Sequence, residues 1–258
     1  MPKRVRLSAM PTDLDRRSVL LGLLSAAAII ADDDLLAQEP SGPPDPSLYI
    51  PKVHLVDDLK FLHDFMEEFG FVTLVTPTPT LRITHIPSIL DRTKGKFGTV
   101  RGHISAQNPQ KAALDGTHQA VIVFRGPQGY ISPTWYATQT EVVPTWNFGV
   151  VHASGRPRAI TDKAATHDLL ATLIARNERR VGSTKYDFAG QPQEYVDRMM
   201  QGISPFEMEI EALEGKFKLG QERTEPDRKG VLENLARGAY KERSLHDLTE
   251  AFYKSHPK

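Results

Sequence analysis

Apolar residues recur every three or four positions between residues 57 and 70, and this period predicts an amphipathic helix. Asp57 has a side chain suited to cap the start of the helix, and Gly70 can end it. One face of this helix would carry Leu59, Leu62, Phe65, Met66 and Phe69. We therefore expect the folded part to begin with a helix whose apolar face packs against a core.

The segments that follow are short, rich in β-branched and aromatic residues, and separated by turn residues. This pattern predicts strands over 71–76, 81–86, 99–105, 120–124, 129–132 and 146–153. The first two would pair across the turn at 77–80, Pro-Thr-Pro-Thr. Short strands at this spacing are typical of an antiparallel barrel or sandwich.

Helical spacing returns after Thr161 and Asp162, where leucines and an isoleucine between 169 and 174 share one side. A shorter helix is expected over 193–201, and two more over 227–237 and 245–253. Residues 206–213 alternate apolar and acidic residues, which predicts one half-buried strand with a solvent-facing edge of glutamates. Regular alternation of strand and helix is missing, so we expect a mainly β fold with flanking helices, of the α+β class.

The N-terminal segment has the pattern of an export signal. Arg16 and Arg17 precede an apolar run from Leu20 to Ala31, which is shorter than the roughly 20 residues that span a bilayer. This pattern is typical of the twin-arginine route, which carries folded proteins, and Ala37 is a plausible cleavage point. An ordinary short helix or a mis-started reading frame is the alternative.

We therefore divide the chain into a signal segment (1–37), a Pro-rich linker (38–47) and a folded domain (48–258). The expected location is the periplasm or another exported site, and the cytoplasm if the leader does not function. No stable membrane span is expected.

Composition narrows the classes of function. Lys and Arg together number 32, as do Asp and Glu, so the chain lacks the broad positive field that supports DNA binding. The absence of cysteine excludes disulfides, thiolate metal sites and a cysteine nucleophile. No pair of histidines at helical spacing accompanies a carboxylate, so no metal site is expected.

Aromatic residues gather between 129 and 148, in a chain that is only 8% aromatic. Rings beside prolines and hydroxyls suit the wall of a pocket for a flat ligand, because they supply apolar surface and fixed hydrogen bonds. A pair of aromatic strands that pack the core is the alternative. The rings belong to Tyr130, Trp135, Tyr136, Trp146 and Phe148.

Several separated motifs occur in the order known from one protein family. They are 84–87 (THIP), 102–110 (GHISAQNPQ), 124–136 (FRGPQGYISPTWY), 143–148 (VPTWNF) and 214–223 (EGKFKLGQER). With these motifs the chain, from Tyr49 to about Leu235, resembles the PaiB-type family of FMN-binding negative transcriptional regulators. The resemblance implies an FMN-binding split β-barrel with C-terminal helices, and a homodimer in which both subunits share each flavin cleft.

On this resemblance the flavin phosphate would meet cations and hydroxyls, and the isoalloxazine ring would meet a flat wall with polar groups at its edge. The residues expected at the phosphate are Lys216, Lys218, Arg223, Ser105 and Thr84. The wall would consist of Trp135, Tyr136 and Trp146, and the edge of His85, His103, Asn108 and Gln221.

The chain departs from the family pattern at a few positions. Ala106 stands where the family usually has an arginine, and Gly220 and Glu222 replace a serine and an asparagine. A carboxylate near the anionic phosphate is unfavourable unless it points away. FMN is the expected ligand, while haem, with His85 or His103 as axial ligand, or another planar molecule stays an alternative.

The resemblance leaves the biological role open between two classes. One is a redox or flavin-sensing protein, which includes an FMN-dependent oxidoreductase; the other is the transcriptional regulator that the family label implies. An exported protein would not meet chromosomal DNA, so the first class is expected if the leader functions.

Overall fold

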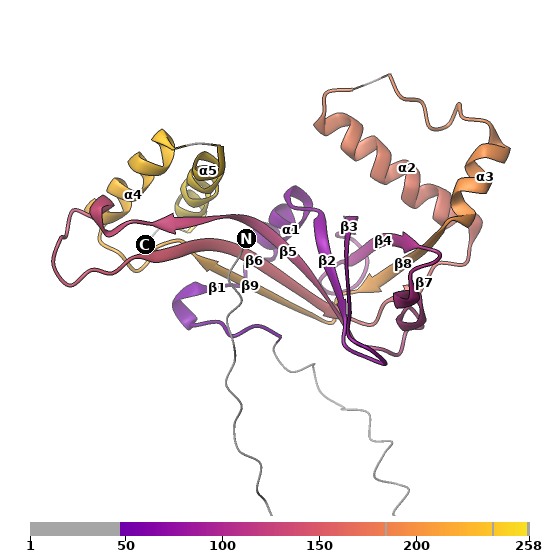
Figure 1. Cartoon of the computed structure of the whole chain (residues 1–258), viewed down its shortest axis with the longest axis horizontal. Helices are drawn as coiled ribbons and strands as arrows, with labels where there is room; N and C mark the ends of the chain where they lie inside the picture. Colours follow the sequence, from indigo (N-terminus) through magenta and orange to yellow (C-terminus); the bar gives the residue numbers. More distant parts are fainter. Residues whose placement is uncertain (1–46, 184, 239, 257–258) are drawn as a thin grey trace, which may run out of the picture. The chain divides into compact units, whose positions relative to one another are not determined.

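The computed structural model describes residues 47–183, 185–238 and 240–256. The expected signal segment, and all of the expected linker except Ser47, lie outside the described residues. The described part consists of one antiparallel sheet with helices packed against it (Figure 1). This arrangement confirms the expected α+β class, a split β-barrel with C-terminal helices.

The described residues form a sheet of nine strands in the order β1-β9-β6-β5-β2-β3-β4-β8-β7. The strands are β1 (Leu55–Val56), β2 (Phe71–Thr76), β3 (Arg82–Asp91), β4 (Thr99–Ser105), β5 (Ala120–Ile131), β6 (Thr145–Gly155), β7 (Arg158–Ala159), β8 (Ile203–Glu209) and β9 (Ala212–Lys218). The helices are α1 (Leu59–Glu68), α2 (Lys163–Arg180), α3 (Gln193–Gln201), α4 (Glu225–Arg237) and α5 (Tyr240–Ser255). Short 3-10 turns are η2 (Lys52–His54), η3 (Pro109–Ala113) and η4 (Pro133–Trp135).

Side-chain caps fix where the helices begin. Asp58, one residue after the expected cap, accepts a hydrogen bond from the Phe61 amide over 3.0 Å and starts α1. Asp162 starts α2 as expected, through a 2.7 Å bond from the Ala165 amide. Thr224 caps α4, so that helix begins two residues earlier than the sequence pattern indicates.

The main core lies between one face of the sheet and the helices α1, α4 and α5. Phe65 and Met66 of α1 pack there with Leu74 of β2, Phe124 of β5 and Phe217 of β9. The expected apolar face of the first helix thus covers the sheet. Burial of these rings and aliphatic side chains supplies most of the favourable free energy of folding.

Helix α2 packs on the opposite face of the sheet. Ile89 of β3 forms a small buried cluster with Leu169 and Leu173, whereas its neighbour Leu90 packs into the main core. Because successive strand residues point to opposite faces, this contact places α2 outside the barrel. Beyond α2 the same outer face continues over β2, β5, β6 and β9.

We call this continuation the open face. Its members are the outward-pointing residues Leu55, Phe71, Thr73, Val75, Ile83, His85, Val121, Val123, Arg125, Gln128, Tyr130, Trp146, Phe148, Val150, His152, Glu214, Lys216 and Lys218. Several of its large apolar side chains are about half exposed or more, with Phe71 at 70% and Ile83 at 57%. Such exposure over adjacent strands is typical of a surface that binds a ligand or a partner.

Two strand predictions were wrong. Residues 120–124 and 129–132 belong to one strand, β5, in which a bulge between Arg125 and Gln128 keeps the pairing with β6. Residues 206–213 are divided between β8 and β9, which lie on different parts of the sheet. The Ile210 and Glu211 amides donate to Gly98 and Ser154 carbonyls, and these bonds break the expected strand.

The expected row of solvated glutamates is wrong at one position. Glu207 pairs with Lys94 and with Arg158, each over 2.6 Å, and its side chain is only 17% exposed. Burial acts against its ionised form, but the hydrogen bonds from Lys94 and Arg158 prevail and hold the pKa of Glu207 below its ordinary value. This glutamate therefore ties β8 to the neighbouring loop and to β7.

Candidate functional site

The register of the sheet brings polar residues of distant segments into one row on the open face. His85 lies opposite Thr73, Thr73 opposite Val123, Val123 opposite His152, and His152 opposite Glu214. The row crosses β3, β2, β5, β6 and β9 in that order. Two imidazoles and a carboxylate therefore share one surface, although the sequence separates them widely.

Hydrogen bonds fix the histidines at both ends of this row. His85 Nδ1 lies 2.9 Å from Thr73 Oγ1, and His152 Nδ1 lies 2.9 Å from Ser47 Oγ. Ser47 Oγ also donates to Glu214 over 2.7 Å. Burial lowers the pKa of His152, and the nearby Glu214 offsets part of this shift. His152 therefore stays neutral at neutral pH and can accept or donate a hydrogen bond.

Lysine and arginine side chains lie in the rows of the open face next to the row of His85 and His152. Lys216 donates to the Tyr49 carbonyl over 2.7 Å, and its Nζ lies 5.7 Å from the Phe148 ring centre. Lys218 donates to Thr145 Oγ1 over 2.6 Å. Among the described residues neither lysine forms an ion pair with a carboxylate, and Arg125 on the same face has none either. Their charges are available to an anionic ligand.

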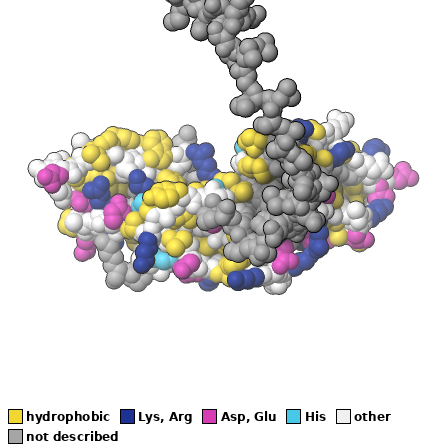
Figure 2. Space-filling view, turned by 90° about the horizontal axis from the view of Figure 1, so that it is seen from below, with side chains coloured by type: hydrophobic (Ala, Val, Ile, Leu, Met, Phe, Trp, Pro, Cys, Tyr) yellow, Lys and Arg dark blue, Asp and Glu magenta, His cyan; other side chains and the backbone are white. Residues whose placement is uncertain are grey.

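Aromatic rings stand beside these cations. The rings of Tyr130 and Trp146 pack edge to face with their centres 6.4 Å apart, and the Trp146 indole N–H donates to Gln128. Trp146 is 48% exposed, so one side of its ring is free for a flat ligand. Figure 2 shows one side of the molecule, on which hydrophobic side chains are interspersed with lysine, arginine and histidine side chains.

Thr84 and Asn108, both expected at the flavin, lie on the inner side of the sheet. Asn108 Nδ2 donates to Thr84 Oγ1 over 2.9 Å, and Thr84 donates to the buried Gln110. The Gln110 amide then donates to Thr76 and to backbone carbonyls of β2 and β3. These bonds attach η3 to the sheet, and they occupy much of the hydrogen-bonding capacity of the two residues.

A second group of expected site residues lies under α4 and α5. Tyr136 is 4% exposed, and the Arg223 guanidinium lies 4.5 Å from its ring centre. Burial raises the pKa of Tyr136. Gln221 donates to the Val53 and Phe217 carbonyls, and the Trp135 backbone packs against Gly230 of α4. Thr145 lines a small hollow with Tyr136 and Arg223, and it accepts the hydrogen bond from Lys218 of the open face.

His103 and Ser105 lie on the outer face of β4. His103 Nδ1 is buried and has no hydrogen-bond partner in the described structure, and burial lowers its pKa. Ser105 is exposed at the strand end, where its hydroxyl accepts from the Gln107 amide over 3.3 Å. An unpaired buried nitrogen is costly, so it marks a position that a ligand or water can complete.

The positions that depart from the family pattern have specific surroundings. Lys111 places its ammonium group 2.8 Å from the Ala106 carbonyl, so a cation lies close to the position of the missing arginine. Glu222 is directed to the buried His54, with 3.9 Å between its carboxylate oxygen and His54 Nε2. Gly220 has a φ of 79°, a conformation that favours glycine. Each departure therefore has a local physical reason.

We expect the stability of the chain to fall as pH drops below about 6.5, because burial lowers the pKa values of His54, His103 and His152. The folded state then binds fewer protons than the unfolded state, so acid favours unfolding, by about 1.4 kcal/mol per pKa unit and group. Melting temperatures between about pH 7.5 and about pH 5.5 measure this loss. His103→Gln should make the slope shallower, and a slope equal to that of the wild type would contradict the expectation.

The described residues provide no group of three or more histidines and carboxylates that could hold a metal ion. In that part of the chain no helix has the length and apolar character that a membrane crossing requires.

Sequence reasoning missed several residues of the open face and its edge. Arg125 stands inside one of the recognised motifs, and the period-2 alternation of β5 could have placed it outward. Arg176 and Arg180 stand four residues apart, the spacing that puts two side chains on one side of a helix. Phe71 and Ile83 could not be assigned to a surface without the pairing of β2 with β3.

Comparisons with known proteins find relatives over most of the chain. The chain is 29% identical over 189 residues to the Protease synthase and sporulation protein PAI 2 of Bacillus subtilis, covering 73% of this chain and 89% of the relative. It is also 29% identical over 236 residues to an uncharacterised protein of Aspergillus fumigatus, covering 73% and 90% of the two chains.

Solved structures with a related fold have low sequence identity. The flavocytochrome Anf3 of Azotobacter vinelandii is 15% identical, with a TM-score of 0.47 over 72% of this chain and 78% of that one. The FAD and heme binding protein of Mycobacterium smegmatis is 12% identical, with a TM-score of 0.46 over 64% and 73% of the chains.

The family model described as "Putative FMN-binding domain" matches residues 48–212. This range includes β1 to β8 and most of the open face, and it ends at the first residue of β9. The match covers more than half of the chain, and the family resemblance inferred from the motifs is confirmed. The chain therefore belongs to this family of FMN-binding domains.

Proposed function

We propose that the chain binds FMN on its open face. The observation that carries this proposal is the combination of exposed aromatic rings with lysine and arginine side chains that have no carboxylate partner among the described residues. Elsewhere the strong cations Arg92, Arg101 and Arg158 are paired with carboxylates. An anionic planar molecule supplies negative charge to pair with these cations and a flat apolar body to cover these rings.

The residues present fit the parts of FMN. Trp146, Tyr130 and Phe148 provide flat apolar surface for the isoalloxazine ring, and His85 with Thr73 provides polar groups for its edge. Lys216 and Lys218 provide positive charge. When bound, a flavin supplies electron or hydride transfer, and these side chains bind it, orient it and limit its contact with water. We therefore propose a redox or flavin-sensing role.

We also propose that two copies of the chain pair through their open faces. Leu55, Phe71 and Ile83 are each at least half exposed there, and a stable partner would remove this apolar area from water. Tyr136 and Arg223 of the second group line a small hollow together with Tyr253 of α5. In a dimer, these residues of one chain could contact FMN bound on the open face of the other chain, because a twofold interface brings different parts of two chains together.

Export through the twin-arginine route remains part of the proposal. It rests on Arg16, Arg17 and the short apolar run alone, and these lie outside the described residues. A regulator that binds DNA directly gains no support from the charge balance, because positive and negative side chains are equal in number. Fractionation of cells that produce the full chain tests the location.

Titration of the full chain with FMN, followed by quenching of flavin fluorescence, tests the binding proposal. Lys216→Gln and Lys218→Gln should each weaken FMN binding by about tenfold, since a hydrogen bond to a charged group contributes roughly 1.5–3 kcal/mol. Lys254→Gln is the matched control, because Lys254 on α5 pairs with Glu250 and stands away from the open face. FMN should also bind more tightly than riboflavin, which lacks the phosphate.

Either of two results would contradict the proposal. One is a wild-type chain that quenches no FMN fluorescence; the other is an equal effect of the Lys216, Lys218 and Lys254 substitutions. The absorption spectrum of protein isolated from cells separates the alternatives, because a Soret band would indicate haem in place of flavin.

A further inference from the structure

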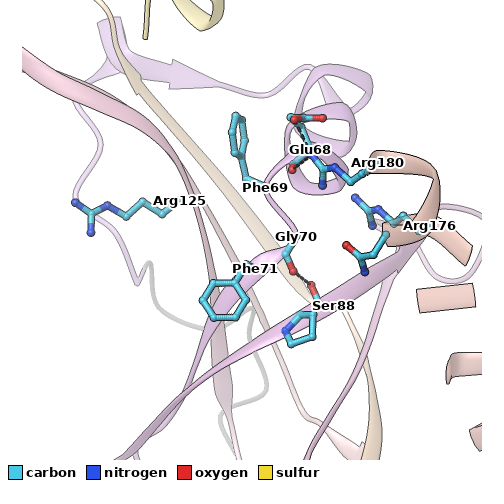
Figure 3. A pocket seen from close by; sticks show the side chains of 10 residues that line it. Glu68, Phe69, Gly70, Phe71, Ser88, Arg125, Arg176 and Arg180 are labelled. Atoms are coloured by element: carbon cyan, nitrogen blue, oxygen red, sulfur yellow. Dashed lines mark hydrogen bonds and ion pairs between the residues drawn. The ribbon is translucent and has the colours of Figure 1, made fainter. Parts of the chain in front are cut away.

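A cavity of about 390 Å³ opens where the open face meets α2. The end of α1, the start of β2 and the middle of β3 form its floor, and α2 forms one wall (Figure 3). Arg125 of β5 lines the other side, where its guanidinium points away from Arg176 (Figure 3). The cavity is large enough for a small organic molecule. None of the residues expected at the flavin lines it.

The guanidinium groups in this cavity differ in their partners. Arg180 is occupied, because it donates to the Glu68 carbonyl and pairs with the Glu68 carboxylate, each over 2.6 Å. Arg176 and Arg125 form no hydrogen bond or ion pair within the described residues. A planar guanidinium presents five donors, so a half-buried one without partners leaves a strong site for an anion.

The position of Arg176 is built into the fold. Gly70 follows α1, and a Cβ added there would lie 3.5 Å from a guanidinium nitrogen of Arg176 and 3.0 Å from the Ser88 carbonyl. A side chain at Gly70 would therefore crowd the Ser88 carbonyl and contact the Arg176 guanidinium, which lies close to this part of the backbone. Burial and the nearby Arg180 lower the pKa of Arg176, and a bound anion would offset both effects.

The remaining lining combines the polar side chains of Glu68 and Asn177 with flat apolar groups. Phe69, Phe71 and Pro87 present rings to the cavity, and Phe71 is 70% exposed. Ser88 offers little to a ligand, because its hydroxyl donates to the Gly70 carbonyl over 3.2 Å. The ligand that suits such a lining carries its negative charge on one end and an apolar ring on the other.

We propose that this cavity binds an organic anion, a carboxylate or phosphate ester on a flat apolar body, through Arg176. That the anion lies beside bound flavin, as reaction partner or effector, rests on the proposed function. That the cavity binds the anion does not depend on it. Pro87 and Phe71 belong to the cavity and also lie one row from His85 and Thr73 on the open face. A ligand here would therefore border the flavin without displacing it.

Calorimetric titration of the full, flavin-free chain with phenyl phosphate tests this inference. Arg176→Gln should weaken binding by about tenfold or more, because it removes a charge-assisted hydrogen bond. Arg179→Gln is the matched control: Arg179 neighbours Arg176 on α2, is exposed and does not line the cavity. Inorganic phosphate should bind more weakly than phenyl phosphate, since it lacks the ring.

Equal losses in the Arg176 and Arg179 variants would overturn the proposal, because they would indicate a general effect of positive charge. It would also be overturned if phenyl phosphate failed to bind, if inorganic phosphate bound as tightly, or if saturating FMN abolished the binding. A chain that binds phenyl phosphate through Arg176 but takes up no FMN would refute the proposed flavin function and leave this site intact. The reverse result would refute this site alone.

Discussion

Phe217→Ala should destabilise the chain by about 3–5 kcal/mol, the usual cost of removing a fully buried phenylalanine. Phe217 is 0% exposed, and its ring contacts those of Phe61, Phe65 and Phe252 with centres 5.1, 4.9 and 6.0 Å apart. It thus joins α1, α5 and β9 at one point. Truncation would leave a cavity that none of these elements can close without giving up other contacts. Denaturant unfolding measures the loss.

Tyr186→Ala is the matched control for this prediction. Tyr186 is 49% exposed in the connection between α2 and α3, so removing its ring should change the free energy of unfolding by less than about 1 kcal/mol. A loss below about 1 kcal/mol in the Phe217 variant would contradict the arrangement of the core. The same variant should bind less FMN only to the extent that it unfolds, because Phe217 points into the core.

Local patterns in the sequence predict the elements whose periodicity is simple. β2 and β4 have the bounds that alternation indicates, and α3 has those expected from its helical spacing. Each of these elements lies between clear turn signals or caps. The prediction fails over 206–213, where alternation continues unbroken although the chain changes strands at Ile210 and Glu211. The bonds that impose this change come from Gly98 and Ser154, which are distant in sequence.

The candidate site was predictable only in part, because it depends on register. Motif recognition selected His85, Trp146, Lys216 and Lys218, and the structure places all of them on the open face. It also selected Thr84 and Asn108, which the Gln110 network holds on the inner side. A motif identifies which segments contribute to a site, but a shift of one residue in the strand decides the face. The flavin roles of the selected residues therefore stay predictions.

The unpaired cations show why charge counts alone could not find the site. The chain has a net charge of zero, and some of its cations, such as Arg92, Arg156 and Arg158, are neutralised locally by carboxylates. What distinguishes Lys216 and Arg176 is a position beside aromatic rings, at Phe148 and at Phe69 and Phe71, which is a property of the three-dimensional arrangement. The composition excludes a broad positive field, while the fold creates a local one.

Ile83→Asp should weaken self-association of the chain by about 100-fold, because it places a charge in an interface that would exclude water. Ile83 is 57% exposed on β3 of the open face, so the substitution costs little in an isolated subunit. In a dimer through the open faces the carboxylate would be buried without a counter-charge. Sedimentation equilibrium over a range of concentrations measures the change, and FMN affinity should fall with dimer content if the ligand is shared.

Val181→Asp separates this effect from that of an added charge. Val181 is 75% exposed at the end of α2 and does not belong to the open face, so this variant should associate like the wild type. A wild-type chain that stays monomeric, or an Ile83 variant that still dimerises normally, would show that the open face is not the interface. The Ile83 variant could also be monomeric and still bind FMN with unchanged affinity. Each flavin site would then be complete within one chain, and residues of a partner subunit would not contribute to it.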